Sequence, residues 1–95
     1  MAAYVIADGL QVRDATAFRE YQPQAAATVQ QYGGKFLVLG GPAQTLEGDW
    51  QPSLVIIEFE SAAQARAWYD SPEYRPLRDL RQRAVDMQVV LVEGV

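Results

Sequence analysis

Hydrophobic residues recur along this chain with two different periods. Short runs rich in Val, Ile, Leu and Phe predict four strands, at residues 4–7, 35–40, 54–59 and 89–92. Between the first two runs, apolar residues from Phe18 to Tyr32 recur every three or four positions, which predicts an amphipathic helix capped by Asp14. Gly33 and Gly34 are expected to end it, because glycine readily adopts the left-handed conformation that closes a helix.

The segment between the third and fourth runs predicts a second helical section that is broken in two. Ser61 is placed to cap a short helix that continues through Tyr69. Because Pro76 cannot donate a backbone hydrogen bond, we expect a tight turn over 72–75 and a regular helix over about 76–85.

Glycine and proline interrupt the chain after the second predicted strand. Residues 40–42 break or bulge that strand, and residues 43–46 are expected to continue it as a ribbon. Residues 47–52 are predicted to form a loop.

The predicted order is β-α-β-β-α-β, which is the order of the ferredoxin-like α+β fold. Right-handed crossovers place both helical sections on one face of a four-stranded antiparallel sheet. With 95 residues the chain has room for one hydrophobic core, so we expect a single domain over residues 1–95.

The other face of this sheet is expected to be apolar as well. The third strand has apolar residues on both sides, with Val55, Ile57 and Phe59 on one and Leu54 and Ile56 on the other. Since the chain supplies helices for one face alone, the simplest cover for the second is another copy of the same sheet, which predicts a homodimer. A monomer that tolerates a few exposed aliphatic side chains is the alternative.

The amino-acid composition excludes several kinds of partner and of catalytic or metal-binding site. Apolar residues make up 49% of the chain and charged residues 21%, as in folded proteins, and the net charge of −4 argues against nucleic acid as a partner. The chain has no Cys and no His, so thiolate nucleophiles and the commonest metal and haem ligands are excluded, and we expect neither a metal nor a cofactor. Chemistry would have to rest on carboxylates, Tyr, Arg or Lys, or else on a bound cofactor, which we do not expect.

The location of the protein is expected to be cytoplasmic. The first ten residues lack the basic start and apolar run of a signal peptide, and no stretch approaches the roughly 20 apolar residues that span a bilayer.

Nine short sequence motifs follow one another in order along the chain. They are Tyr4-Val5-Ile6-Ala7, Glu20-Tyr21, Tyr32-Gly33-Gly34-Lys35, Gly40-Gly41, Leu46-Glu47-Gly48-Asp49-Trp50, Ile57-Glu58-Phe59, Ser71-Pro72-Glu73-Tyr74, Leu80-Arg81 and Val92-Glu93-Gly94-Val95. Together they resemble, from end to end, the family catalogued as domain of unknown function 1330. The resemblance implies a dimeric α+β barrel, a fold shared with cofactor-free monooxygenases, muconolactone isomerases, stress-responsive barrel proteins and some haem-binding proteins. It implies no reaction.

The predicted loop holds the first candidate site. Glu47 and Asp49 could act as acid, base or hard-cation ligands beside the indole of Trp50. The structural alternative is a turn at Gly48 in which Asp49 bonds nearby amides and Trp50 packs at the rim of a dimer.

A second candidate site combines residues from the third strand and the last helix. Glu58 falls on the strand side assigned to the dimer or a cavity, where a partly desolvated carboxylate suits general acid or base work. Tyr74, Arg78 and Arg81 share a helix face if the helix includes Tyr74, and such a face could hold an anion. The alternatives are an ion pair of Glu58 with Arg81 or Arg78, and an exposed face on which Arg81 binds Glu73.

Two hypotheses for function follow. The first is a small-molecule site between the helices and the sheet, for an anionic or aromatic compound, with cofactor-independent catalysis as one form of it. The residues expected to line that site are Tyr21, Glu58, Tyr74 and Arg81, with Trp50 near its mouth. The second is a dimeric binding or interaction domain without catalysis.

Overall fold

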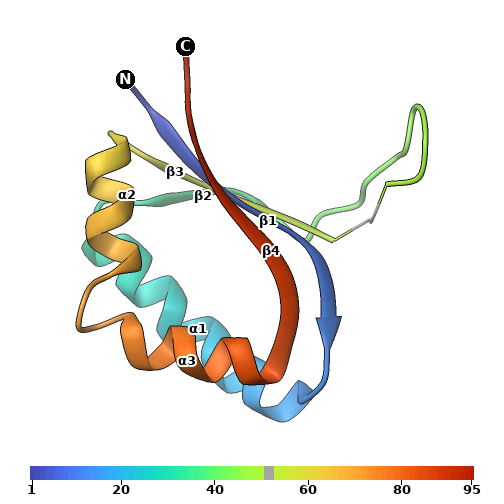
Figure 1. Ribbon diagram of the computed structural model, residues 1–95, viewed down its shortest axis with the longest axis horizontal. Helices are drawn as coiled ribbons and strands as arrows, with labels where there is room; N and C mark the ends of the chain where they lie inside the picture. The colour runs from blue at the N-terminus through green and yellow to red at the C-terminus, as the bar shows by residue number, and fades with distance from the viewer. Residues whose placement is uncertain (51–52) are drawn as a thin grey trace.

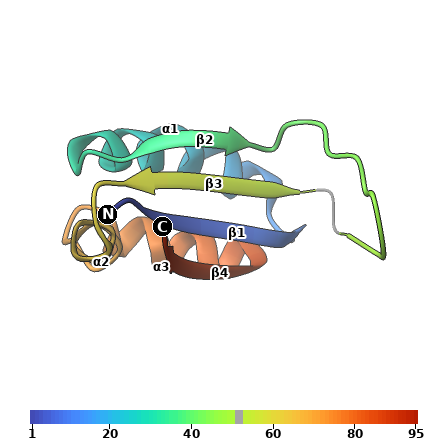
Figure 2. The same cartoon turned by 90° about the horizontal axis from the view of Figure 1, so that it is seen from above.

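The computed structural model describes residues 1–50 and 53–95 and has the predicted ferredoxin-like α+β fold. The elements in chain order are β1 (Ala3–Val12), α1 (Ala15–Gln31), β2 (Lys35–Leu39), β3 (Leu54–Phe59), α2 (Ala62–Tyr69), α3 (Arg75–Ala84) and β4 (Val85–Glu93). The four strands form one antiparallel sheet in the order β2-β3-β1-β4 (Figure 2). All three helices lie on the same side of this sheet (Figure 1). No helix within the described residues is long and apolar enough to cross a membrane.

The helix ends follow the capping residues that the sequence predicted. Asp14 Oδ1 accepts a hydrogen bond from the Ala17 amide at 3.0 Å, and Ser61 Oγ accepts one from the Gln64 amide at 3.1 Å. At the end of α1, Gly33 has φ +78° and the Gly34 amide donates to the Val29 carbonyl at 2.8 Å, which closes the helix.

The central strand β1 and the edge strand β4 are longer than predicted. β1 extends to Val12 and β4 begins at Val85, which pairs with Val12. The register between β1 and β4 shifts between Asp8 and Gln11, where Gly9 has φ +66°. Hydrophobic pattern alone missed these ends because their polar residues still pair through backbone hydrogen bonds.

The segment after β2 does not form the expected ribbon. Residues 41–45 are neither strand nor helix, so that expectation is wrong. Gly40, with φ +65°, turns the chain after its amide bonds the Leu54 carbonyl, and Pro42 has no amide to donate to a ladder. In the predicted loop at 47–52, residues 51 and 52 lie outside the described residues.

The sheet has two apolar faces. On the helix side, Val5 pairs with Ile57 and both are buried against α1 and α2. On the open side, Ile6 pairs with Ile56 and with Val90, and the Val90 side chain remains 52% exposed. The apolar part of this open face has no cover among residues 1–50 and 53–95 of one chain.

Candidate functional site

A cavity of about 490 Å³ lies between the helices and the sheet. All three helices, or the turns that lead into them, and all four strands contribute to its wall, and most of the side chains that line it are apolar. The polar groups that concern its chemistry come from Tyr21 on α1, Tyr69 on α2, Tyr74 before α3, and Arg81 on α3. A largely apolar cavity with a few convergent polar groups is the usual form of a small-molecule site.

Arg81 is the charged side chain of this wall. The residue is 4% exposed, and no ion pair within the described residues includes its guanidinium. Its Nε is buried and has no hydrogen-bond partner there. Removing a charge from water without a counter-ion is costly, so an unpaired buried guanidinium is unusual for a residue that serves stability alone.

Two tyrosine hydroxyls accompany Arg81. The hydroxyl oxygens of Tyr21 and Tyr74 are 2.6 Å apart, so one hydroxyl donates to the other. Only one of the two protons is used in this bond, and the accepting hydroxyl keeps its own proton for another partner. The pair therefore presents a hydrogen-bond donor next to the buried cation.

The position of Tyr74 is fixed by the turn that precedes α3. The Tyr74 amide donates to Ser71 Oγ at 3.1 Å, and Ser71 Oγ in turn donates to the Trp68 carbonyl at 2.8 Å. The Tyr74 ring packs on the Trp68 ring with centroids 4.2 Å apart, and Trp68 Nε1 donates to Thr28 Oγ1 at 3.0 Å. Packing and hydrogen bonds thus hold this tyrosine from the backbone to the ring.

The ionisation of these groups follows from their burial. Burial, reinforced by the Tyr74 hydroxyl, raises the pKa of Tyr21 far above its ordinary value. Burial also raises the pKa of Tyr74, and the Arg81 charge opposes this only in part. Burial disfavours the charged form of Arg81, but attraction to the ionised forms of Tyr74, Tyr21 and Tyr69, which arise only at high pH, outweighs it and the pKa of Arg81 is raised. At neutral pH the site therefore has two neutral phenols and one cation.

Glu58 lies on the opposite face of the sheet from this cluster. It pairs with Tyr4 on β1 and with Lys35 on β2, both on the open face. Side chains alternate along a strand, so Glu58 cannot share a side with its neighbours Ile57 and Phe59, which face the helices. The prediction that it would line the cavity is wrong, as is the alternative of an ion pair with Arg81 or Arg78.

Glu73 does not bind Arg81 either. Its carboxylate accepts a hydrogen bond from the Tyr32 hydroxyl at 2.8 Å and one from Gln31 Nε2 at 3.3 Å. The bond from Tyr32 lowers the pKa of Glu73. This carboxylate joins the end of α1 to the turn before α3, outside the cavity.

Arg78 has a structural position beside the cavity and is not part of the wall. Its Nη1 donates to the Tyr69 carbonyl at 3.0 Å and to Asp70 Oδ1 at 3.2 Å, and its guanidinium lies 4.7 Å above the centre of the Tyr69 ring. Asp70 also pairs with Arg66 at 2.9 Å. These contacts join α2 to α3 and leave the Asp70 carboxylate engaged outside the site.

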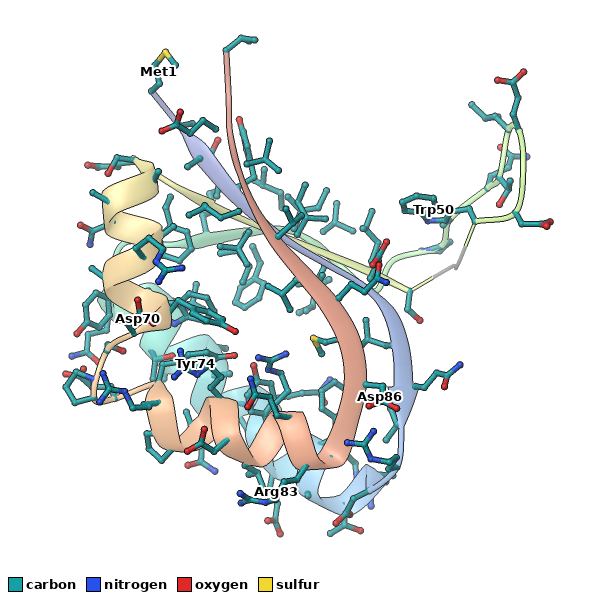
Figure 3. The ribbon with its side chains drawn as sticks, viewed as in Figure 1. Met1, Trp50, Asp70, Tyr74, Arg83 and Asp86 are labelled. Carbon is teal, nitrogen blue, oxygen red and sulfur yellow. The ribbon has the colours of Figure 1, made fainter. Side chains whose placement is uncertain are left out.

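The loop candidates are remote from the cavity. Glu47, Asp49 and Trp50 are exposed, and they lie on the segment between β2 and β3, which projects away from the helices. Figure 3 shows Trp50 on this segment, far from Tyr74. Among residues 1–50 and 53–95, no three Asp, Glu, His or Cys side chains gather into a metal-binding group.

Sequence reasoning did not identify several members of the wall. The aromatic ones are Phe18, Phe36, Trp68 and Tyr69. The helical spacing did mark Phe18 as part of an inward-facing stripe. Trp68 and Tyr69 carried no such signal, because a helix of eight residues is too short for its periodicity to separate an inward from an outward face.

Comparisons with known proteins agree with the fold. The model of the family described as Domain of unknown function (DUF1330) matches residues 2–95. No functionally curated protein matches the chain in sequence.

Solved structures with the same fold include proteins without a known function and one oxygenase. RPA0582 from Rhodopseudomonas palustris, of unknown function, is 21% identical with a TM-score of 0.76, and the match covers 99% of this chain and 82% of that one. A dimeric ferredoxin-like protein from Jannaschia sp. CCS1 is 15% identical with a TM-score of 0.65, over 99% and 100% of the two chains. SnoaB, a cofactor-independent oxygenase from Streptomyces nogalater, is 13% identical with a TM-score of 0.68, over 99% and 92%. These similarities concern the fold.

Proposed function

This chain belongs to the DUF1330 family, whose function is unknown, and we propose from the residues of its cavity that the cavity binds a small organic acid whose anionic group contacts Arg81. One observation carries the proposal, namely a buried guanidinium that has no carboxylate partner within the described residues. A carboxylate is the natural complement, since guanidinium and carboxylate form paired, charge-assisted hydrogen bonds.

The rest of the cavity favours an apolar and planar body for this ligand. A volume of about 490 Å³ is within the range of small-molecule sites. Phe18 and Tyr21 stack with centroids 5.9 Å apart and an interplanar angle of 14°, and Trp68 lines the same space. Aromatic side chains of this kind pack well against a flat ring.

A matched pair of ligands tests the proposal. Binding of 2-naphthoate and of its neutral amide, 2-naphthamide, would be measured by calorimetry with the wild-type protein. We expect the acid to bind at least tenfold more tightly than the amide, because only the acid neutralises Arg81. The Arg81→Gln variant should bring the two affinities to within about twofold of each other.

Arg83 offers the control. It lies two residues further along α3 and is exposed, and its side chain makes no ion pair within the described part of the chain. The Arg83→Gln variant should keep the preference for the acid. Equal loss in both variants would indicate general electrostatic attraction, and an unchanged preference in Arg81→Gln would contradict the proposal.

A second candidate function is cofactor-independent catalysis on the bound acid. It is favoured by the pair of neutral tyrosine hydroxyls beside Arg81, which can donate hydrogen bonds to a reacting oxygen. SnoaB, which has the same fold, is described as a cofactor-independent oxygenase. Incubation of purified protein with aromatic acids in air, followed by mass spectrometry of the small molecules, separates the two functions. Turnover that Tyr21→Phe reduces would support catalysis, and unchanged ligands would leave a binding domain.

We also propose that the protein acts as a homodimer joined through the open face of the sheet. Its apolar side chains, including Ile6, Ile56 and Val90, have no cover from the described part of one chain. Neighbours with the same fold are described as dimeric. If no acid binds the cavity, a dimeric interaction domain becomes the better description of the function.

A further inference from the structure

We propose that Arg81 and the hydroxyl pair of Tyr21 and Tyr74 form an oxyanion site, which holds a bound phenol or enol as its conjugate base. The inference rests on the proposed function, since it concerns the same cavity, and it adds the chemical class of the ligand. That class is a planar aromatic compound with one weakly acidic hydroxyl group.

The charges around the cavity argue for a ligand with a single negative charge. Arg81 supplies one positive charge to the wall, and no Asp or Glu is among the described residues that line it. The other ionisable side chains among the described residues of the wall are the phenols of Tyr21 on α1, Tyr69 on α2 and Tyr74 before α3. A neutral ligand leaves the cation uncompensated, a monoanion neutralises it, and a dianion adds a buried negative charge.

The hydrogen-bonding groups favour the deprotonated form of such a ligand. Arg81 Nε is a buried donor without a partner in the part of the chain that the structure describes, and the hydroxyl pair retains one proton that its own bond does not use. Fixed donors directed at an oxygen stabilise its negative charge most strongly where water is excluded. As far as the structure describes the wall, it contributes no carboxylate that could accept a hydrogen bond from a neutral hydroxyl ligand.

The proposed step is an ionisation and involves no oxidant or reductant. The O–H bond of the bound phenol or enol breaks, its electron pair stays on the ligand oxygen, and the proton is released to bulk water. The anionic oxygen then accepts hydrogen bonds from Arg81 and from one tyrosine hydroxyl.

The direction in which the ligand's own pKa shifts on binding distinguishes an oxyanion site from a cavity that only encloses the ligand. Two opposing effects determine that direction. Burial in an apolar cavity raises the pKa of a phenol, whereas an adjacent cation lowers it by about one to three pH units. A cavity that merely encloses the ligand gives the first result, and an oxyanion site gives the second.

The test uses 4-nitro-1-naphthol, whose anion absorbs at longer wavelengths than its neutral form. Its absorbance would be titrated with pH, free in buffer and with saturating wild-type protein. We expect the bound pKa to be at least one pH unit below the free value. In Arg81→Gln it should be at or above the free value, and in Tyr21→Phe it should lie between these limits. Arg83→Gln, the same control as above, should match the wild type.

The possible failures are distinct. Binding of 2-naphthoate together with a raised pKa of bound nitronaphthol, or with no nitronaphthol binding, would overturn the oxyanion site and leave the proposed function intact. Failure of both compounds to bind would overturn both proposals. If Arg81→Gln did not fold, by circular dichroism, Arg81→Met would replace it, with the same expected result.

Discussion

The buried position of Arg81 is not explained by a contribution to the stability of the fold. The residue is 4% exposed and has no carboxylate partner among the described residues. In other proteins, replacing buried charges by apolar groups of similar volume is often neutral or stabilising. A cost in stability of this kind is common at functional sites.

Substitution of Arg81 by methionine tests this reading directly. We expect Arg81→Met to unfold, without ligand, at the same free energy as the wild type or up to about 2 kcal/mol higher, because a desolvated charge is removed. Urea unfolding followed by circular dichroism provides the measurement. A loss of more than about 2 kcal/mol would show that the guanidinium holds the fold together, since breaking a required buried pair costs 3–5 kcal/mol.

Gly34 is constrained by its neighbours and not by its backbone conformation. A Cβ atom at this position would lie 2.7 Å from Val29 Cγ1 and 2.8 Å from Phe59 Cε1, and both of these residues are 1% exposed. Side chains packed this tightly cannot move aside without strain.

We therefore expect Gly34→Ala to lower the free energy of unfolding by about 1–3 kcal/mol, as overpacking does in other cores. Gly41 is a matched control, because a Cβ there meets nothing within 4 Å and its φ is not positive. Gly41→Ala should change stability by less than about 0.5 kcal/mol. Equal effects of the two substitutions in urea unfolding would contradict the packing explanation.

At the residue level the sequence predicted part of the candidate site. Tyr21 and Tyr74 were expected near a cleft, and the structure brings both to the cavity with Arg81. Glu58 does lie on the strand side opposite Ile57 and Phe59, as predicted, but that side is the open face, so the expectation that it lines the cavity is wrong. The burial of Arg81 was not predictable, because arginine on a helix is normally exposed.

At the scale of elements, polar caps and turn residues predicted helix ends closely. α2 occupies the predicted residues up to Tyr69, and α3 begins one residue before the predicted helix. Strand ends were less predictable, because pairing depends on backbone groups that every residue carries. The extension of β4 back to Val85 is an example, since Asp86 and Gln88 gave no apolar signal.

The cap at the start of α1 yields a prediction at this scale. Asp14→Ala removes the bond to the Ala17 amide and should cost about 0.5–2 kcal/mol of stability. Asp14→Ser keeps an oxygen able to accept that bond and should recover most of the loss. Urea unfolding of the three proteins gives the comparison, and equal losses in both variants would show that the charge of Asp14, and not its cap, matters.

At the scale of the whole molecule, the uncovered sheet decides the expected assembly. Val90 lies at its edge on β4 and is 52% exposed in one chain. Val90→Lys places a charge in the proposed interface and should shift the protein from dimer to monomer at micromolar concentration, because burying an unpaired charge is costly. Sedimentation velocity measures the change.

Ala63→Lys is the corresponding control, because Ala63 is exposed on α2 on the side of the sheet away from the open face. It should leave the dimer unchanged. A wild-type protein that sediments as a monomer, or a Val90→Lys variant that remains dimeric, would contradict the proposed interface.

The two tryptophans give the protein a built-in optical sensor. Trp68 lies in the cavity wall against the Tyr74 ring, whereas Trp50 lies on the projecting segment (Figure 3). In a Trp50→Phe variant, all tryptophan emission would come from Trp68. A compound that enters the cavity should then quench or shift this emission in proportion to occupancy, so ligands could be found by screening without any label.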